Sequence, residues 1–284
     1  MKREEEAGPM QQQSQSRQQS PRDEDGRPGA ARPVLEAIGL TKRYEDSVLA
    51  LDHVSFSVLP GQIFAMLGGN GAGKTTTIHL FLDFLRPTEG MARIDGIDVH
   101  ADPLAAKERV AYVSENVMLY GNFTAVENLA YFARLGGRAI TRDDCRAVLL
   151  RVGLQQEAHD RKLRGFSKGM RQKCGIAIAI AKDAPAILLD EPTSGLDPRA
   201  GHEFLGLLRS LRDEGKAILM STHDIFRAKE SANVVAILDR GRIVLQRRRE
   251  ELEHEDLEAL YLRYIAGGGA VRTEEGRLDV PALG

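Results

Sequence analysis

The sequence predicts an α/β fold built around a parallel sheet, because short apolar runs alternate with helical patterns along most of the chain. The runs QIFAML, AILLD and KAILMS begin at Gln62, Ala186 and Lys216 and have the continuous apolar character of buried strands. A glycine-rich loop follows the first run. The helical pattern KTTTIHLFLDFLRP follows that loop and predicts a helix that stops at Pro87. VVAILDRGRIVLQ predicts a hairpin that turns at residues 239–241.

Mostly helical signals interrupt these strands between Thr124 and Leu163. TAVE and TRDD, which begin at Thr124 and Thr141, have the form of capping boxes, and glycines mark the helix ends. We therefore expect a helical subdomain at about residues 116–170, inserted into the parallel core. GIAIAIAK, residues 175–182, alternates like a strand, and its propensity and period do not decide between strand and helix.

The composition is that of an ordinary globular protein. The chain has 284 residues, 42% of them hydrophobic and 28% charged, which suffices for one large domain or two small ones. Its formal net charge of -2 gives no support to nucleic-acid binding, which usually needs a basic surface, so we expect no nucleic-acid partner. Cys145 and Cys174 fall in predicted helices and are expected to be buried thiols.

The two ends of the chain differ in composition from its centre. Residues 1–33 are rich in Gln, Ser, Arg, Pro and Glu and predict a disordered tail. A domain at residues 34–265 follows, and a glycine-rich break predicts a loose tail at residues 266–284. No apolar run approaches the roughly 18 residues that span a bilayer, and the N-terminus lacks a signal-peptide core. We expect a cytosolic protein, and if it works at a membrane, a partner must supply the span.

The segment GGNGAGKTT matches the phosphate-binding pattern G-x-x-x-x-G-K-[ST]. Its glycines let backbone N–H groups point at phosphate oxygens, and the following helix directs its positive end there. Lys74 is expected to reach the β- and γ-phosphates of ATP, and the Thr75 hydroxyl to bind Mg²⁺. The candidate ATP-binding residues of this loop are Gly68, Gly69, Asn70, Gly71, Ala72, Gly73, Lys74, Thr75 and Thr76.

Two acids follow the predicted strand AILLD. Asp190 ends the strand, where it could hold a Mg²⁺-bound water. Glu191 comes next and is placed to polarise an attacking water as a general base. Acids in a turn or at a helix N-cap are the other interpretation, and the phosphate loop earlier in the chain favours the catalytic one.

These motifs and their order resemble the nucleotide-binding subunit of an ATP-binding cassette (ABC) transporter, over roughly Val34 to Ile265. FSKGMRQK stands where that family has its LSGGQ signature, THD supplies the switch histidine, SGLD matches the D-loop, and RYEDSVLALDHVSF supplies the aromatic that stacks on adenine. The corresponding residues are Ser167, Lys168, Gly169 and Met170 in the signature, then His223, Asp197 and Tyr44. By resemblance a helix follows Ser167, so GIAIAIAK is expected to be helical.

The resemblance implies a P-loop NTPase (RecA-like) core with an antiparallel β subdomain and an inserted α-helical subdomain. It implies an ATPase that uses Mg²⁺ with ATP and pairs with a second ABC ATP-binding subunit, either a copy of itself or a relative. Ser167 and Gly169 of one subunit would contact the γ-phosphate held by the other. The SKGM signature looks like that of ABC-2-type exporters, whose multi-span membrane permease is a separate chain. The expected function is to power a bacterial exporter through ATP-driven closing and opening of the dimer.

Four residues depart from the family pattern: Gly69 stands where Pro is common, Lys168 and Met170 alter the signature, and Glu115 replaces the Q-loop glutamine. Glu115 follows a predicted strand in AYVSENVMLYGNF, and its carboxylate is expected to reach Mg²⁺. The apolar residues 117–120 are expected to line a groove for a short helix of the permease, or else to belong to the subdomain core.

Two other functions are compatible with an ATP site: a non-transport ABC ATPase and a regulatory ATP-binding module. The 93 residues from Lys74 to Ser167 contain no heptads or CxxC pairs, which leaves no room for the insertions of the first class. Lys74, Asp190, Glu191 and His223 are all present, which argues against an inactive module.

Overall fold

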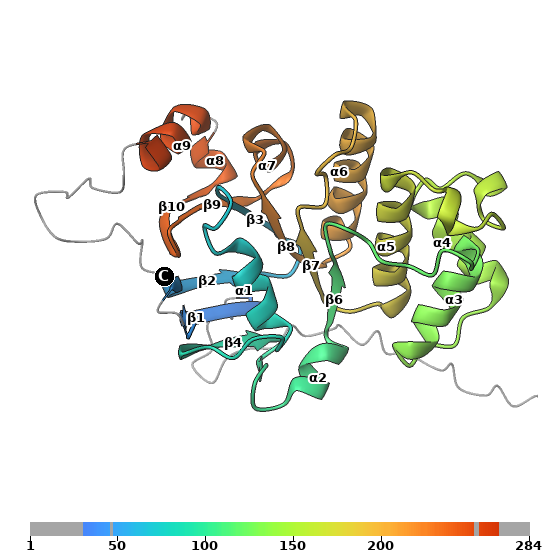
Figure 1. The fold of residues 1–284 in the computed structure, drawn as a ribbon, viewed down its shortest axis with the longest axis horizontal. Helices are drawn as coiled ribbons and strands as arrows, with labels where there is room; N and C mark the ends of the chain where they lie inside the picture. Colours follow the sequence, from blue (N-terminus) through green and yellow to red (C-terminus); the bar gives the residue numbers. More distant parts are fainter. Residues whose placement is uncertain (1–30, 46–47, 253–255, 267–284) are drawn as a thin grey trace, which may run out of the picture. The chain divides into compact units, whose positions relative to one another are not determined.

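The computed structural model describes residues 31–45, 48–252 and 256–266, which form two β-sheets flanked by helices (Figure 1). The larger sheet has the strand order β10-β9-β3-β8-β7-β6. Its strands are β3 (Ile63–Leu67), β6 (Val110–Val113), β7 (Ala186–Asp190), β8 (Ala217–Thr222), β9 (Val234–Asp239) and β10 (Arg242–Arg248). The smaller sheet has the order β2-β1-β4-β5 and is antiparallel throughout. Its strands are β1 (Leu35–Arg43), β2 (Leu49–Val58), β4 (Glu89–Ile94) and β5 (Ile97–Asp98).

The larger sheet is parallel from β9 to β6, and only the edge strand β10 runs antiparallel to its neighbour. Every residue of β3, β7 and β8 is buried, as expected of parallel strands that are covered on both faces. The predicted parallel core is therefore confirmed. Its strands all point the same way, so β3, β6, β7 and β8 present their carboxyl ends at one edge of the sheet, which we call the carboxyl edge.

The two faces of the larger sheet carry different layers. On one face, Phe64 and Met66 pack with helix α1 (Lys74–Phe81) and with the smaller sheet. On the other face, Ile63 and Ala65 pack with α5 (Lys168–Lys182), α6 (Pro198–Asp213) and α7 (Ile225–Ser231). These four consecutive residues of β3 alternate between the two faces because successive side chains of a strand point to opposite sides of the sheet.

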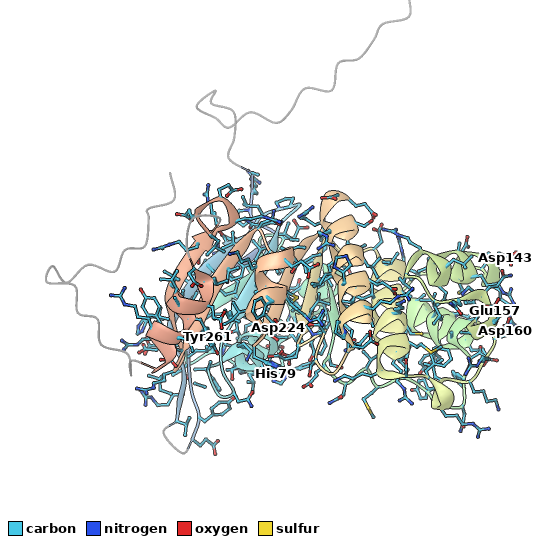
Figure 2. The ribbon with its side chains drawn as sticks, turned by 90° about the horizontal axis from the view of Figure 1, so that it is seen from above. His79, Asp143, Glu157, Asp160, Asp224 and Tyr261 are labelled. Carbon is cyan, nitrogen blue, oxygen red and sulfur yellow. The ribbon has the colours of Figure 1, made fainter. Side chains whose placement is uncertain are left out.

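A helical segment, residues 116–167, connects β6 to α5. It contains α3 (Ala125–Leu135), α4 (Arg142–Arg151) and two short 3₁₀ turns, η1 (Gln156–Ala158) and η2 (Leu163–Gly165). Both predicted capping boxes are present, at the starts of α3 and α4. Figure 2 shows Asp143, Glu157 and Asp160 together at the far end of this segment, away from Tyr261 of α9 (Leu257–Ala266). The domain limits proposed from the sequence stay predictions.

Helix α5 resolves the ambiguous run GIAIAIAK, which is helical as the resemblance implied. A Cβ at Gly175 would lie 3.0 Å from Val113 Cγ1 and 3.2 Å from Val117 Cγ2. The small residue therefore lets α5 approach β6 closely. The two cysteines, one on α4 and one on α5, are buried and free, and burial raises the pKa of the Cys174 thiol to about 12.

One predicted boundary is wrong. Helix α1 ends at Phe81 rather than at Pro87, because Asp83 adopts a left-handed conformation (φ 53°) and the amides of Phe84 and Leu85 both donate to the carbonyl of His79. The predicted hairpin is confirmed: β9 and β10 are joined at Arg240 and Gly241, both with positive φ. The remaining helices are α2 (Pro103–Glu108) and α8 (Arg249–Leu252).

The predicted disordered N-terminal tail falls almost wholly on residues 1–30, and the predicted C-terminal tail on residues 267–284, which lie outside the described residues. Within the described ranges, no helix combines the length and the apolar character needed to cross a membrane.

Candidate active site

The carboxyl edge gathers the predicted site residues from distant parts of the sequence. The phosphate loop follows β3, the two acids stand at the end of β7, and His223 follows β8. Thr222, at the end of β8, accepts a hydrogen bond at 3.2 Å from the amide of Gly68, which ties the start of the phosphate loop to this strand. Parallel topology thus brings together segments that the sequence separates by more than a hundred residues.

Two glycines of the phosphate loop are required by space and backbone conformation. A Cβ at Gly68 would lie 2.5 Å from the carbonyl oxygen of Leu238, and one at Gly73 would lie 2.6 Å from that of Ala50. Gly73 also has a left-handed φ of 111° just before α1 begins. Gly69 differs, because nothing lies within 4 Å of a Cβ placed there. A Cβ at position 69 would therefore meet no obstacle within the chain, so packing does not explain why glycine replaces the usual proline there.

The ammonium group of Lys74 is buried at the centre of the loop. It donates to the carbonyl oxygens of Gly68 at 2.7 Å and Gly69 at 3.2 Å. It also lies 3.2 Å from Oε1 of Glu191, whose side chain is largely buried. The predicted phosphate-binding lysine and the predicted general base are thus direct neighbours, and each offsets the desolvation of the other.

Asp190 lies at the centre of an oxygen-rich group. Thr75 Oγ1 donates to its Oδ2 at 3.1 Å, and Ser221 Oγ donates to its Oδ1 at 2.5 Å. Burial, assisted by the negative charge of Asp190, raises the pKa of the Tyr112 hydroxyl to about 12. A hydroxyl and a carboxylate are hard oxygen donors of the kind that Mg²⁺ prefers, so this pair fits the predicted metal.

Ser221 was not predicted as a site residue. Its hydroxyl donates to Asp190 and accepts from the amide of Glu191 at 2.9 Å, so it joins the two acids. The only signal in the sequence was its position at the end of a predicted strand, KAILMS, which does not distinguish a site residue from a core residue.

Glu191 has the left-handed backbone conformation (φ 45°) that is uncommon for residues other than glycine and clusters at functional sites. Its second oxygen, Oε2, lies 2.8 Å from Nδ1 of His223. A cavity of about 150 Å³ opens beside these two side chains. It is lined by Glu191, Thr193, Ser194, Gly195, Leu196, Thr222, His223, Asp224 and Arg227.

The signature residues form the first turn of α5. Ser167 is exposed and caps the helix by accepting from the amide of Met170 at 3.3 Å. The side chain of Glu115 reaches the same turn: its Oε1 accepts from Ser194 Oγ at 2.9 Å and lies 3.5 Å from Lys168 Nζ. The contact of Glu115 with Mg²⁺ stays a prediction.

The remaining predicted residues have defined places. Tyr44 is exposed just beyond β1, with Lys42 Nζ 5.4 Å from its ring centre. Asp197 caps α6 by accepting from the amide of Ala200 at 2.9 Å. In the apolar run at 117–120, Val117 and Leu119 pack against the core, whereas Met118 (85% exposed) and Tyr120 (48%) face solvent.

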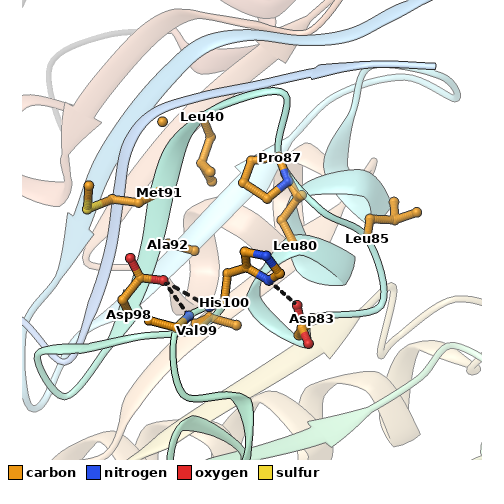
Figure 3. Close-up of a pocket in the computed structure, with 12 residues that line it drawn as sticks. Leu40, Leu80, Asp83, Leu85, Pro87, Met91, Ala92, Asp98, Val99 and His100 are labelled. Atoms are coloured by element: carbon orange, nitrogen blue, oxygen red, sulfur yellow. Dashed lines mark hydrogen bonds and ion pairs between the residues drawn. The ribbon is translucent and has the colours of Figure 1, made fainter. Parts of the chain in front are cut away.

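A second cavity, of about 220 Å³, lies beside the smaller sheet and contains none of the predicted site residues (Figure 3). Figure 3 shows His100 turned toward Asp83, with Nδ1 3.2 Å from Oδ1. Two backbone amides donate to the Asp98 carboxylate, so this acid is engaged in a local turn. The cavity walls are otherwise mostly apolar side chains, including Leu40 and Leu80.

Comparison with known proteins decides the family. The family model described as "ABC transporter" matches residues 51–194. This chain belongs to the ABC transporter family. The ABC subunit is 34% identical to the daunorubicin/doxorubicin resistance ATP-binding protein DrrA of Streptomyces peucetius, over 88% of this chain and 76% of that protein. It is 33% identical to the ABC transporter ATP-binding protein NatA of Bacillus subtilis, over 80% of this chain and 96% of that protein.

Solved structures agree with this assignment. An ATP-binding subunit of an ABC transporter superposes with a TM-score of 0.73 at 30% identity, covering 81% of this chain and 98% of that one. A dimeric ATP-binding cassette bound to ADP and Pi after hydrolysis gives 0.69 at 26% identity, covering 76% and 98%. The ABC subunit is thus a P-loop ATPase whose hydrolysis of ATP is coupled to transport, and its relatives are of exporter type. These relatives favour the exporter subunit over the non-transport ATPase and the regulatory module.

Proposed function

We propose that this ABC subunit works as one half of a head-to-tail pair at the inner face of the cell membrane, where it drives a multi-span permease of the ABC-2 type. One observation carries the proposal: Lys74, Glu191 and His223 form a continuous chain of contacts at the carboxyl edge, beside the Thr75–Asp190 pair. ATP hydrolysis requires a cation that binds the phosphates, a base that activates water and ligands that hold Mg²⁺, and this site has side chains of all three kinds.

In this proposal the backbone amides of Gly68 to Thr76 and the ammonium of Lys74 bind the phosphates of ATP, and Tyr44 stacks on adenine. Thr75 and Asp190 would hold Mg²⁺. The ion neutralises charge on the phosphate oxygens when bound. Ser221 keeps Asp190 oriented through its 2.5 Å hydrogen bond.

Glu191 is the proposed general base. Its neighbours orient both of its oxygens, with Lys74 on Oε1 at 3.2 Å and His223 on Oε2 at 2.8 Å. A carboxylate held on two sides loses little freedom when it accepts a proton from water. His223 has the proposed role of holding that geometry and of contacting the γ-phosphate.

The signature turn is proposed to contact ATP bound to the second subunit. Ser167 is exposed at the start of α5, and Gly169 is the second residue of that helix. A Cβ at Gly169 would make only ordinary contacts, 3.5 Å from Leu196 and 3.9 Å from Ala200. Packing within the chain therefore does not require glycine at position 169. A nucleotide that approached this backbone closely would require it.

The permease is proposed to dock on the exposed aromatic patch of the helical segment, which comprises Met118, Tyr120, Phe123 and Tyr131. The ring centres of Tyr120 and Phe123 are 5.1 Å apart, and those of Tyr120 and Tyr131 are 5.2 Å apart. Buried Asn128 fixes the patch, because its side chain accepts from the amide of Tyr120 at 2.9 Å and donates to the carbonyl of the same residue at 3.1 Å. Exposed apolar surface of this kind marks a contact site.

Two measurements test the proposal. Light scattering of the purified chain with and without ATP should show a dimer that depends on ATP, and the Lys74→Ala variant should remain monomeric and hydrolyse no ATP above background. The chain should also co-purify with a multi-span membrane protein. A chain that hydrolyses ATP equally well with Lys74→Ala, or that stays monomeric at saturating ATP, would contradict the proposal.

A further inference from the structure

We propose that Glu115 is a positioning residue that holds the ammonium group of Lys168, and that it competes for this group with the ATP phosphates presented by the second subunit. The proposal rests on the head-to-tail pairing proposed above. Glu115 and Lys168 are two of the four positions where the chain departs from the family pattern. The proposal explains them as an interacting pair.

The contacts join three segments of the carboxyl edge. Glu115, beyond β6, lies 3.5 Å from Lys168 Nζ at the start of α5 and accepts from Ser194 Oγ at 2.9 Å in the loop after β7. The carbonyl of Glu115 also accepts from the side chain of Gln172, one turn further along α5, at 2.9 Å. Glu115 is thus tied to α5 by its main chain and by its side chain.

The Lys168 side chain follows a defined path to this carboxylate. A Cβ at Gly195 would lie 3.6 Å from its Cδ and 3.5 Å from its Nζ, so the Lys168 side chain passes the side of Gly195 on which a side chain would stand. The ammonium group also stands in the first turn of a helix, where the macrodipole opposes a cation. A carboxylate beside it offsets that unfavourable field, and glutamine in place of Glu115 would not.

The Glu115–Lys168 pair is partly exposed, so Lys168 can exchange Glu115 for another anion. The Lys168 side chain is 35% exposed and that of Glu115 43%, so solvent screens their attraction. A phosphate group carries more charge and more acceptor oxygens than one carboxylate. When the second subunit brings ATP to the signature turn, its phosphates therefore outcompete Glu115 for Lys168, and breaking the pair raises the ATP concentration needed for closure.

Removing the competitor should make closure easier. The experiment uses the full chain with Glu191→Gln, which prevents hydrolysis, and measures by light scattering the ATP concentration at half-maximal dimer. Adding Glu115→Gln, whose amide oxygen still accepts from Ser194, should lower that concentration about two- to fivefold, the range of a partly exposed ion pair. In a Lys168→Met background, which keeps the stem, Glu115→Gln should have no effect.

The matched control is Glu203→Gln. Glu203 lies on α6, and its carboxylate is 3.1 Å from Lys173, which is on the same helix as Lys168, α5. This substitution should leave the ATP dependence unchanged. Lys168→Gln serves as a second uncharged variant, and urea unfolding midpoints verify that each variant is folded.

Two results would overturn the inference. Glu115→Gln could leave the ATP dependence unaltered, or it could shift it equally with Lys168 and with Met at position 168. The second result would assign the carboxylate to Mg²⁺ instead of to Lys168. A parent chain that forms no dimer with ATP overturns the proposed function together with the inference, whereas either of the first two results leaves the proposed function intact.

Discussion

Glu191 and His223 are joined side chain to side chain, with Oε2 of the acid 2.8 Å from Nδ1 of the imidazole. An ionised carboxylate only accepts hydrogen bonds, so Nδ1 carries the hydrogen in this pair. Lys74 takes the other carboxylate oxygen. Any change at Glu191 therefore alters the surroundings of two further residues that the proposed mechanism uses.

The first prediction concerns Glu191→Gln. Glutamine keeps the shape but cannot accept a proton from water, so ATP turnover should fall by about 10²–10⁴ while ATP still binds. The ATP-bound dimer should accumulate, because closure precedes hydrolysis in the proposed mechanism. Steady-state hydrolysis by the purified complex with its membrane partner gives the rate, and Glu157→Gln, at the far end of the helical segment, is the control that should not change it. Normal turnover by Glu191→Gln would remove this residue from the mechanism.

The second prediction concerns Ser221, which joins the two acids. Ser221→Ala removes a buried donor to Asp190 and a buried acceptor for the Glu191 amide, and should lower the free energy of unfolding by about 1–3 kcal/mol. Because Asp190 then loses its orientation, the Mg²⁺ concentration at half-maximal hydrolysis should rise about 10- to 100-fold.

Ser231→Ala is the matched control, since it removes another buried hydroxyl, which donates to the Arg227 carbonyl in α7. It should change stability without changing the Mg²⁺ requirement. If both variants shift the Mg²⁺ requirement equally, Ser221 has no specific link to the metal-type ligands.

The third prediction concerns the aromatic patch. Met118→Ser should weaken recovery of the permease in co-purification and lower transport, with hydrolysis by the isolated chain unchanged, because Met118 is exposed on the proposed docking patch and is not one of the proposed ATP-site residues. Leu104→Ser on α2 is a comparable exposed apolar residue and should have no effect on either measurement. Equal loss of transport with both variants would indicate general instability instead of docking.

The fourth prediction concerns acid stability of the helical segment. The backbone hydrogen bond from Thr124 holds the pKa of the Glu127 carboxyl below its usual value, and the side-chain hydrogen bond from Thr141 does the same for the pKa of Asp144. Their stabilisation is therefore complete above the usual pKa values of these groups and is lost as the pH falls through the lowered ones.

A Glu127→Gln, Asp144→Asn variant keeps acceptor oxygens that do not titrate. Its melting temperature, followed by circular dichroism, should decline less than that of the unaltered chain as the pH falls below about 4. Parallel declines of the two proteins would show that the capping boxes do not contribute to acid unfolding.

The sequence was sufficient for the elements with strong local signals. Buried strands such as AILLD, the two capping boxes and the phosphate loop follow from residue type and spacing alone. GIAIAIAK was different, because the run is helical although it alternates, and its Gly175 lies against β6. The end of α1 also escaped prediction: apolar spacing continued to Pro87, whereas the left-handed turn at Asp83 stopped the helix.

The site was predictable where a motif exists and not where a contact is long-range. Lys74 and the two acids stand in recognisable patterns, yet their mutual distances depend on strand order. Ser221 and the pairing of Glu115 with Lys168 have no local signature, since their partners come from other strands and loops. Such contacts become visible only when the sheet register is known.

Strand β8 lies between β3 and β7, and its last residues contact the phosphate loop on one side and the acids on the other. A substitution in β8 must therefore suit two neighbours at once. Asp143, Glu157 and Asp160, at the far end of the helical segment, lie well away from Asp224, which follows β8 (Figure 2). Relatives of this chain should therefore differ less in the last residues of β8 than at the far end of the helical segment.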